Sequence, residues 1–153
     1  MVKKYIVTWD MLQIYAIKLA KKILYIKKWK GIVAISRGGL IPAALIAREL
    51  GIRFVDTICI ASYEHNCKGN IQVLKKTKNY GSEFIIIDDL IDTGSTAKII
   101  KNLYPCAYFV TIFAKPKGKL LVDQYVIDVS QNVWIEQPWD MYLSYRNPIV
   151  KSF

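Results

Sequence analysis

The spacing of hydrophobic residues along this chain changes repeatedly, which predicts alternating helices and strands. An apolar residue recurs every three or four positions over residues 12–23, as on the buried face of an α-helix. Asp10 precedes this stretch, and we expect its side chain to cap the helix. The run 31–35 is rich in β-branched residues and indicates a strand. Pro42 and Gly51 then mark the beginning and end of a second helix, because proline suits a first turn and glycine follows a last one.

The second half of the chain continues the alternation around one continuous apolar run. Residues 84–87, Phe-Ile-Ile-Ile, are typical of a strand buried on both faces. We predict a polar hairpin lid at about 62–81. The remaining predicted elements are strands at 52–60, 107–114 and 125–127 and a helix at 96–103. This order predicts an α/β fold with a mainly parallel sheet flanked by helices. In such sheets ligands bind beyond the carboxyl ends of the strands.

Length and composition indicate a single domain spanning residues 1–153, of which 53% are hydrophobic. No apolar run approaches the roughly 20 residues of a membrane-spanning helix. The first residues lack the pattern of a secretory signal, so we expect a cytoplasmic protein. Three cysteines without a CxxC pair argue against a disulfide framework or a zinc site, and the single histidine argues against a histidine-rich metal cluster.

The formal net charge of +10 raises a nucleic-acid hypothesis. Most of the positive charge comes from lysines spread from Lys3 to Lys151, which is typical of a solvated surface. RNA-binding surfaces favour clustered arginine with exposed aromatic residues, whereas the four arginines here are scattered. We therefore expect an anionic small-molecule substrate and no nucleic-acid partner.

Residues 84–97, FIIIDDLIDTGSTA, carry the most informative chemistry. The buried strand delivers two adjacent carboxylates, Asp88 and Asp89, to its carboxyl end, and Asp92 follows in the loop. The small residues 93–96 then open a helix, where backbone N–H groups and hydroxyls can surround a phosphate. Carboxylates beside a phosphate imply a bridging Mg²⁺ or ribose hydroxyls. The alternative interpretation is that Asp92 caps the helix and that Asp88 and Asp89 are merely solvated. It does not explain why two carboxylates directly follow a buried strand.

This stretch resembles the phosphoribosyl pyrophosphate motif of type I phosphoribosyltransferases. The likeness to bacterial xanthine-guanine phosphoribosyltransferases extends over almost the whole chain, except for the lid and the residues after Met141. Its matching segments are YIVTWDMLQI, ISRGGLIPAALIARELGIR, VTIFAKP and WIEQPWDM. The resemblance implies the type I phosphoribosyltransferase fold with a flexible hood or lid hairpin. It also implies transfer of the 5-phosphoribosyl group to purine N9, with release of pyrophosphate.

The resemblance assigns roles to residues at matching positions. Arg37 and Gly38 match the pyrophosphate loop, where the family has a cis peptide, and Asp89 matches the residue nearest Mg²⁺. Asp92 matches the carboxylate that handles the proton at purine N7, with Asp88 as a second catalytic carboxylate. Lys115, Trp134 and Ile135 match residues that read the 6-oxo group, stack on the base and accept from its 2-substituent. Phosphoribosyl pyrophosphate is assigned to Arg37, Gly38, Asp88, Asp89, Leu90, Ile91, Asp92, Thr93, Gly94, Ser95 and Thr96.

The chain departs from the family pattern in the lid, where relatives carry an arginine that reaches the phosphates. Gly69 stands at that position here, and we expect Lys68 to substitute. The resemblance also implies guanine, xanthine and hypoxanthine as bases and a homotetramer. It further suggests peripheral contact with the anionic inner membrane through Lys18, Lys21, Lys22, Lys27 and Lys28.

Two alternatives remain open from the sequence. One is a protein of the same fold that binds RNA as a regulator, for which the basic charge is the argument. The other is an adenine or pyrimidine enzyme of this fold. Lys115 argues against an adenine enzyme, because a 6-amino group offers a lysine no acceptor.

Overall fold

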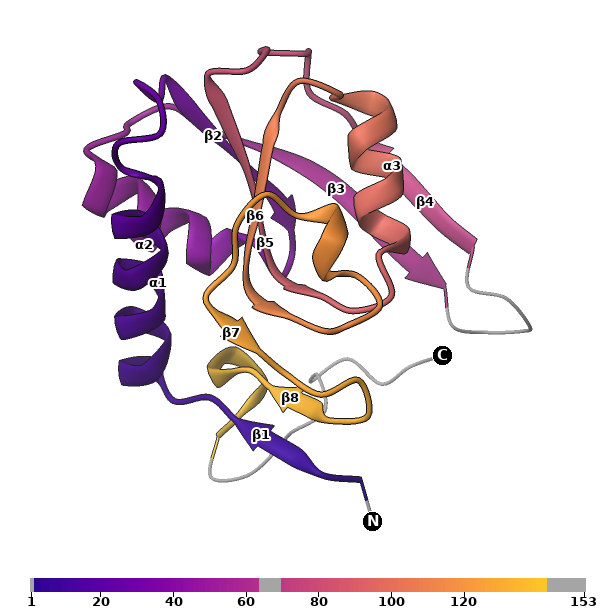
Figure 1. Cartoon of the computed structure of the whole chain (residues 1–153). Helices are drawn as coiled ribbons and strands as arrows, with labels where there is room; N and C mark the ends of the chain where they lie inside the picture. The colour runs from indigo at the N-terminus through magenta and orange to yellow at the C-terminus, as the bar shows by residue number, and fades with distance from the viewer. Residues whose placement is uncertain (1, 64–69, 143–153) are drawn as a thin grey trace.

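The computed structural model describes residues 2–63 and 70–142, and it contains one six-stranded sheet and one two-stranded sheet. The strand order of the larger sheet is β4-β3-β2-β5-β6-β7 (Figure 1). Every pairing in it is parallel except that of β3 with β4. This confirms the predicted α/β fold with a mainly parallel sheet. The strands are β2 (Gly31–Ser36), β3 (Val55–Tyr63), β4 (Asn70–Lys75), β5 (Phe84–Ile91), β6 (Tyr108–Ala114) and β7 (Ile127–Asp128).

Helices cover both faces of the sheet and bury alternate residues of its strands. Helices α1 (Trp9–Ile23) and α2 (Leu40–Leu50) lie on one face, and α3 (Ser95–Leu103) lies on the other (Figure 1). Ile32 of β2 packs in the cluster with α1 and α2, whereas Val33 packs in the cluster with α3. The central strands are therefore apolar on both sides, which explains their continuous hydrophobic runs.

Strand β5 is longer than the apolar run predicted. It continues through the two aspartates to Ile91, and Asp88 pairs with Thr111 of β6. Strand pairing depends on the backbone and not on side-chain polarity, so the ladder with β6 extends past the last apolar residue of the run. The strand therefore carries Asp88 and Asp89 itself and ends just before Asp92.

A second, two-stranded parallel sheet lies apart from the first and was not predicted. It pairs β1 (Lys4–Ile6) with β8 (Trp134–Glu136), with Lys4 opposite Trp134 (Figure 1). Each strand has only three residues, too few for a period-two pattern to be recognised. The pairing brings residues near the N-terminus beside Trp134.

Three local predictions differ from the structure. The side chain that caps α1 is Thr8 and not Asp10: Thr8 has extended backbone geometry and its Oγ1 accepts from the Met11 backbone N–H at 3.2 Å. Asp10 lies in the first turn of the helix instead. The strand predicted at 52–60 begins later, at Val55, and the strand predicted at 125–127 is the two-residue β7. The predicted lid region contains β4, which pairs with β3 as an antiparallel hairpin.

The chain after β6 adds two short 3-10 helices, Lys119–Leu121 and Pro138–Asp140. Within residues 2–63 and 70–142, no helix combines the length and the apolar character needed to cross a bilayer.

Candidate active site

The predicted site residues that follow β2, β5 and β6 come together, because these are adjacent parallel strands whose carboxyl ends share one edge. Arg37 and Gly38 directly follow β2. Asp92 follows β5, and Lys115 follows β6. Three segments that are separated in the sequence by up to 78 positions therefore meet in one place.

The loop after β2 lies against the carboxylates of β5. A Cβ atom built on Gly38 would lie 2.4 Å from Asp89 Oδ1 and 3.2 Å from Asp88 Oδ1. A Cβ on Gly39 would lie 2.2 Å from the backbone oxygen of Ile87. Gly39 therefore requires glycine for steric reasons, because its neighbours are backbone atoms, whereas a side chain at position 38 would force the Asp89 carboxylate to move. The peptide bond between Ser36 and Arg37 is cis, as the resemblance implied for this loop.

Asp88 and Asp89 form a closely packed carboxylate pair. The Asp89 backbone N–H donates to Asp88 Oδ1 at 2.9 Å. Burial raises the pKa of Asp88 well above its usual range, and the neighbouring Asp89 charge adds to this effect. Burial also raises the pKa of Asp89, although hydrogen bonds from its neighbours act in the opposite direction. Such a pair favours a cation or a donor that compensates its negative charge.

The loop between β5 and α3 presents small polar groups at the beginning of a helix. Gly94, the N-cap residue of α3, has a φ of 89°, a backbone conformation that glycine adopts most easily. Thr93 and Ser95 are exposed, and their hydroxyls lie 3.0 Å apart. Ala97 is buried in the first turn of the helix, which fixes α3 against the sheet. This exposed helix N-terminus with two hydroxyls is suited to a phosphate group.

Asp92 is held by a residue on each of its carboxylate oxygens. Lys115 Nζ lies 3.1 Å from Asp92 Oδ2, and Gln131 Nε2 donates to Oδ1 at 2.6 Å. The Lys115 side chain is 6% exposed, whereas that of Asp92 is 48% exposed. A buried ammonium therefore lies directly behind a carboxylate that faces solvent. The arrangement offers a donor and an acceptor side by side.

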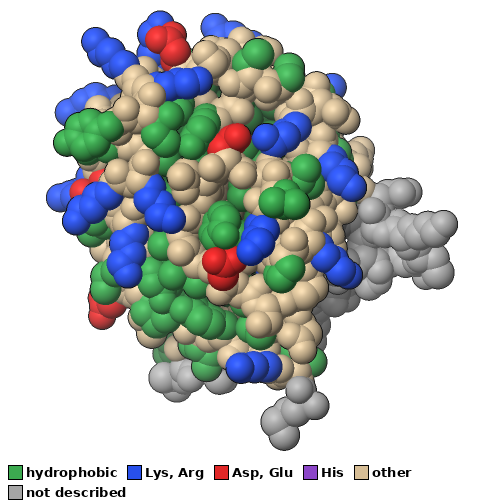
Figure 2. Space-filling view, viewed as in Figure 1, with side chains coloured by type: hydrophobic (Ala, Val, Ile, Leu, Met, Phe, Trp, Pro, Cys, Tyr) green, Lys and Arg blue, Asp and Glu red, His purple; other side chains and the backbone are tan. Residues whose placement is uncertain are grey.

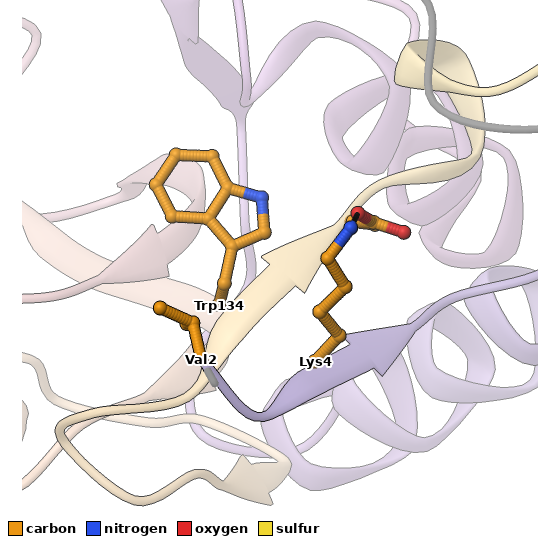
Figure 3. A pocket seen from close by; sticks show the side chains of 4 residues that line it. Val2, Lys4 and Trp134 are labelled. Atoms are coloured by element: carbon orange, nitrogen blue, oxygen red, sulfur yellow. Dashed lines mark hydrogen bonds and ion pairs between the residues drawn. The ribbon is translucent and has the colours of Figure 1, made fainter.

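Strand β8 carries Trp134, whose side chain lines a hollow that does not include Arg37, Asp92 or Lys115. Trp134 is 56% exposed although it is a large apolar residue, while the neighbouring Ile135 is buried. Trp134 lines an open hollow of about 340 Å³ together with Val2, Lys4 and Glu136, and its indole stands beside Val2 (Figure 3). Lys4 reaches across from β1 to Glu136, with Nζ 2.5 Å from Oε1. An exposed indole beside an open hollow is a surface on which a flat ring can stack.

Two glutamines of this region, Gln131 and Gln137, were not predicted. Gln131 contacts Asp92, and Gln137 Nε2 donates to Asp89 Oδ2 at 2.8 Å. Both follow β6 by more than 15 positions, and a lone glutamine has no spacing that signals a contact with a distant carboxylate. Lys68, Gly69 and His65 lie outside the described residues. Among the residues that are described, no three His, Cys, Asp or Glu side chains group as a metal cluster.

Comparisons with known proteins identify the family and match the fold over most of the chain. The family model described as "Phosphoribosyl transferase domain" matches residues 8–146. A purine phosphoribosyltransferase from Pyrococcus horikoshii superposes with a TM-score of 0.77 at 24% identity, over 99% of both chains. A Helicobacter pylori xanthine-guanine-hypoxanthine phosphoribosyltransferase has a TM-score of 0.71 at 19% identity, over 89% of this chain and 93% of that one. A hypothetical protein from Neisseria gonorrhoeae with bound ppGpp has a TM-score of 0.73 at 21% identity, over 92% and 91%.

Proposed function

We propose a purine-salvage function from one premise: the chain belongs to the phosphoribosyl transferase domain family, and its sheet has the type I phosphoribosyltransferase fold. The reaction transfers the 5-phosphoribosyl group of phosphoribosyl pyrophosphate to N9 of a 6-oxopurine and releases pyrophosphate. The bases are guanine and xanthine, with hypoxanthine used less well. The products are GMP, XMP and IMP.

The observation that carries this proposal is the pair formed by Lys115 and Asp92, 3.1 Å apart. In a 6-oxopurine the oxygen on C6 and the nitrogen N7 are neighbours on one edge of the base. Lys115 donates to the 6-oxo oxygen, and Asp92 accepts the proton carried by N7. A base that binds this way presents N9 for attack, since N9 lies on the same five-membered ring as N7. Trp134 stacks on the base, and the Ile135 carbonyl accepts from the 2-amino group of guanine.

The phosphate side of the substrate fits the other two segments. The loop with Arg37 and Gly38 receives the pyrophosphate, and residues 88–96 receive the ribose and the 5-phosphate. The exposed hydroxyls of Thr93 and Ser95 at the N-terminus of α3 support this assignment. Lys68 is proposed to contact pyrophosphate from the lid.

The residues around Asp89 fit a Mg²⁺ ion. Its carboxylate lies beside the glycine loop, where a side chain on Gly38 would displace it, and burial of Asp88 and Asp89 leaves negative charge poorly solvated. Asp89 would hold the ion together with oxygens of the substrate. When bound, Mg²⁺ supplies positive charge that stabilises the departing pyrophosphate.

The chain's own groups account for the rest of the mechanism. Arg37 adds positive charge on the pyrophosphate side, and Asp88 and Asp89 favour the positive charge that develops at ribose C1. Asp92 takes the N7 proton as N9 forms its bond to C1. The β3–β4 hairpin stands at the edge of the sheet next to β2 and is proposed to cover the site, which excludes water from the reacting carbon.

The first prediction tests the choice of base. Incubation with phosphoribosyl pyrophosphate, Mg²⁺ and each base is expected to give nucleotide from guanine and xanthine, less from hypoxanthine and none from adenine. The reason is that Lys115 has only protons to offer at position 6. Nucleotide formation is measured by chromatography, and omission of Mg²⁺ is the control. Efficient use of adenine contradicts this interpretation of the pocket.

An RNA-binding regulator is the alternative function. Lysines and arginines are spread over the face of the molecule in Figure 2, with hydrophobic and polar surface between them, and do not form one stripe. A regulator also has no need for a buried lysine paired with an exposed carboxylate. A salt-sensitive shift of RNA without nucleotide formation is the result that favours this alternative.

Assembly as a homotetramer and peripheral contact with an anionic membrane belong to the same proposal. One feature supports the membrane contact: Leu24, Tyr25 and Ile26 are exposed at the end of α1, between the exposed lysine pairs 21–22 and 27–28. Sedimentation with anionic vesicles at low salt, but not with neutral vesicles, is the expected outcome. Light scattering tests the tetramer.

A further inference from the structure

Two glutamines bracket strand β8, and each donates a hydrogen bond to a different aspartate of the β5 segment. Gln131 lies three residues before Trp134 and binds Asp92 Oδ1, while Gln137 lies three residues after Trp134 and binds Asp89 Oδ2. The segment that carries Trp134 is therefore joined at both ends to the carboxylates at the end of β5.

The orientation of the Gln131 amide is fixed by a second contact. The Lys117 backbone N–H donates to Gln131 Oε1 at 3.0 Å. Since a backbone N–H can only donate, Gln131 must present its oxygen to Lys117 and its NH₂ group to Asp92. Turning the amide over would place two donors together on one side and two acceptors together on the other. Gln131 therefore holds one Asp92 oxygen, while Lys115 holds the other.

Gln137 has the same relation to Asp89 but in a buried setting. It is 4% exposed, and within the described part of the chain its Oε1 is buried with no hydrogen-bond partner. Its NH₂ group occupies one oxygen of Asp89, and the other oxygen lies where a Gly38 side chain would be. Gln137 therefore restrains one oxygen of the Asp89 carboxylate, and the absence of a side chain at Gly38 leaves room beside the other. A buried acceptor without a donor costs free energy, so a structural role alone does not explain why Oε1 stays unpaired.

We propose that Gln131 and Gln137 are positioning residues with separate tasks. Gln137 orients Asp89 for the cation and the pyrophosphate, and its free Oε1 accepts from a water molecule that the cation carries. Gln131 orients Asp92 for the base. This inference rests on the proposed function. It extends that function by dividing the control of metal affinity and of proton transfer between two residues of one segment.

The same substitution at positions 131 and 137 tests whether the two glutamines have these separate tasks. Methionine has nearly the shape of glutamine but neither donates nor accepts strongly, so Gln137→Met and Gln131→Met are matched variants. Calorimetry measures the binding of phosphoribosyl pyrophosphate over a range of Mg²⁺ concentrations, without a base. Steady-state kinetics at saturating Mg²⁺ then gives kcat and the KM for guanine.

Gln137→Met is expected to need about 10-fold more Mg²⁺ for half-maximal binding, as is typical when a residue that orients a metal ligand is lost. Gln131→Met is expected to leave that Mg²⁺ requirement within about two-fold of the parent and to lower kcat about 10-fold. The donor to Gln137 Oε1 could be a water molecule on the cation or a hydroxyl group of the substrate, and the binding of Mg²⁺ alone distinguishes these two. If Gln137→Met binds Mg²⁺ alone more weakly than the parent, the donor is water on the cation. If its affinity falls only when phosphoribosyl pyrophosphate is present, the donor is a substrate hydroxyl, and the proposed contact with water is overturned.

Thermal unfolding of the ligand-free variants separates positioning from a structural role. Gln137→Met is expected to unfold close to the parent's Tm, because it removes an unpaired buried acceptor but also the donor to Asp89 Oδ2, and these two effects on stability oppose each other. If it does not fold, Gln137→Leu replaces it. The inference is overturned if both variants change the Mg²⁺ requirement and kcat alike, or if neither variant changes either quantity. It is also overturned if the change in Mg²⁺ requirement is explained by a lower Tm. If the parent itself binds no phosphoribosyl pyrophosphate with Mg²⁺, the proposed function fails as well.

Discussion

At the scale of single residues, Asp92 connects most of the proposed chemistry. One of its oxygens is engaged by Lys115 and the other by Gln131, yet its side chain remains half exposed. The two contacts fix the direction of the carboxylate, and the exposed part leaves it accessible to a base. A carboxylate held this way is suited to accept a proton from a bound purine without moving.

Replacement of Asp92 by asparagine tests that role. Asp92→Asn is expected to lower kcat by about 10²–10⁴-fold, because an amide cannot take the N7 proton and directs a donor at it. Binding of phosphoribosyl pyrophosphate, measured by calorimetry, is expected to stay within a few-fold of the parent. Asp128→Asn is the matched control, since Asp128 forms a similar ion pair with Lys119 at 3.2 Å outside the proposed site. Equal kcat values for the two variants would remove Asp92 from the mechanism.

At the scale of elements, the site depends on how closely the turn between β2 and α2 approaches β5. This approach is possible because Gly39 lies against the backbone of Ile87 and Ile35. Gly51, at the end of α2, differs: its φ is 66°, but nothing lies within 4 Å of a Cβ placed there. One glycine is therefore required by packing and the other by backbone conformation.

Replacement of these two glycines by alanine is expected to lower the free energy of unfolding by different amounts. Gly39→Ala is expected to lower the free energy of unfolding by about 3 kcal/mol, because the methyl group meets backbone atoms that cannot rotate away. Gly51→Ala is expected to cost about 1–2 kcal/mol, because alanine adopts a left-handed conformation less readily than glycine. Urea unfolding measures both. A larger loss for Gly51→Ala would contradict the packing of this turn against β5.

The hairpin at the edge of the sheet gives a pH-dependent prediction. Asp56 of β3 accepts from the Thr57 backbone N–H at 2.7 Å, from Lys75 of β4 at 3.0 Å and from Tyr80 at 2.9 Å. These donors, the Thr57 N–H first, hold the pKa of Asp56 below its usual value of 3.8. The folded protein thus binds the Asp56 proton less tightly than the unfolded chain does. The resulting stability is present above pH 3.8 and is lost as the pH falls through the lowered pKa.

Asp56→Asn is therefore expected to lower the free energy of unfolding by about 1 kcal/mol at pH 7, since the group is partly exposed and screened by solvent. The difference from the parent should shrink as the pH falls below about 4. Chemical unfolding over pH 3–7 measures it, and Lys75→Met should show a loss of the same sign at neutral pH. A difference that is constant with pH would show that the charge of Asp56 is not involved.

At the scale of the whole molecule, the net charge of +10 acts on encounter with ligands more than on the fold. Blue side chains are distributed over the face seen in Figure 2, so on this face the field is broad and not focused on one stripe. Such a field attracts a substrate that carries several phosphate charges. It has little effect on a neutral base.

Ionic strength separates these two effects. The kcat/KM for phosphoribosyl pyrophosphate is expected to fall about 10-fold or more between low and high salt, because screening shortens the range of attraction. The kcat/KM for guanine should change much less. Stopped-flow or initial-rate measurements in NaCl at constant free Mg²⁺ provide the test. An equal fall for both substrates would point to an effect of salt on the protein itself.

The sequence predicted the class of fold and the central part of the site because both have local causes. The apolar run 84–87 buries a strand on both faces, and a parallel sheet gathers the loops after its strands at one edge. The positions of Asp88, Asp89 and Asp92 relative to that strand were therefore readable in order along the chain. The helix boundaries at Gly51 and near Ser95 also result from local conformational preferences.

The tertiary structure alone decided which residues from distant segments touch these carboxylates. Gln131 and Gln137 bind Asp92 and Asp89 across 39 and 48 positions, and β1 pairs with β8 across the length of the chain. The pairing of Lys115 with Asp92 is of the same kind. The periodicity of apolar residues indicates which face of an element is buried, but a single polar contact between remote segments produces no periodic pattern in the sequence. Such contacts depend on how the sheet and its loops close in space, and only the folded chain determines that.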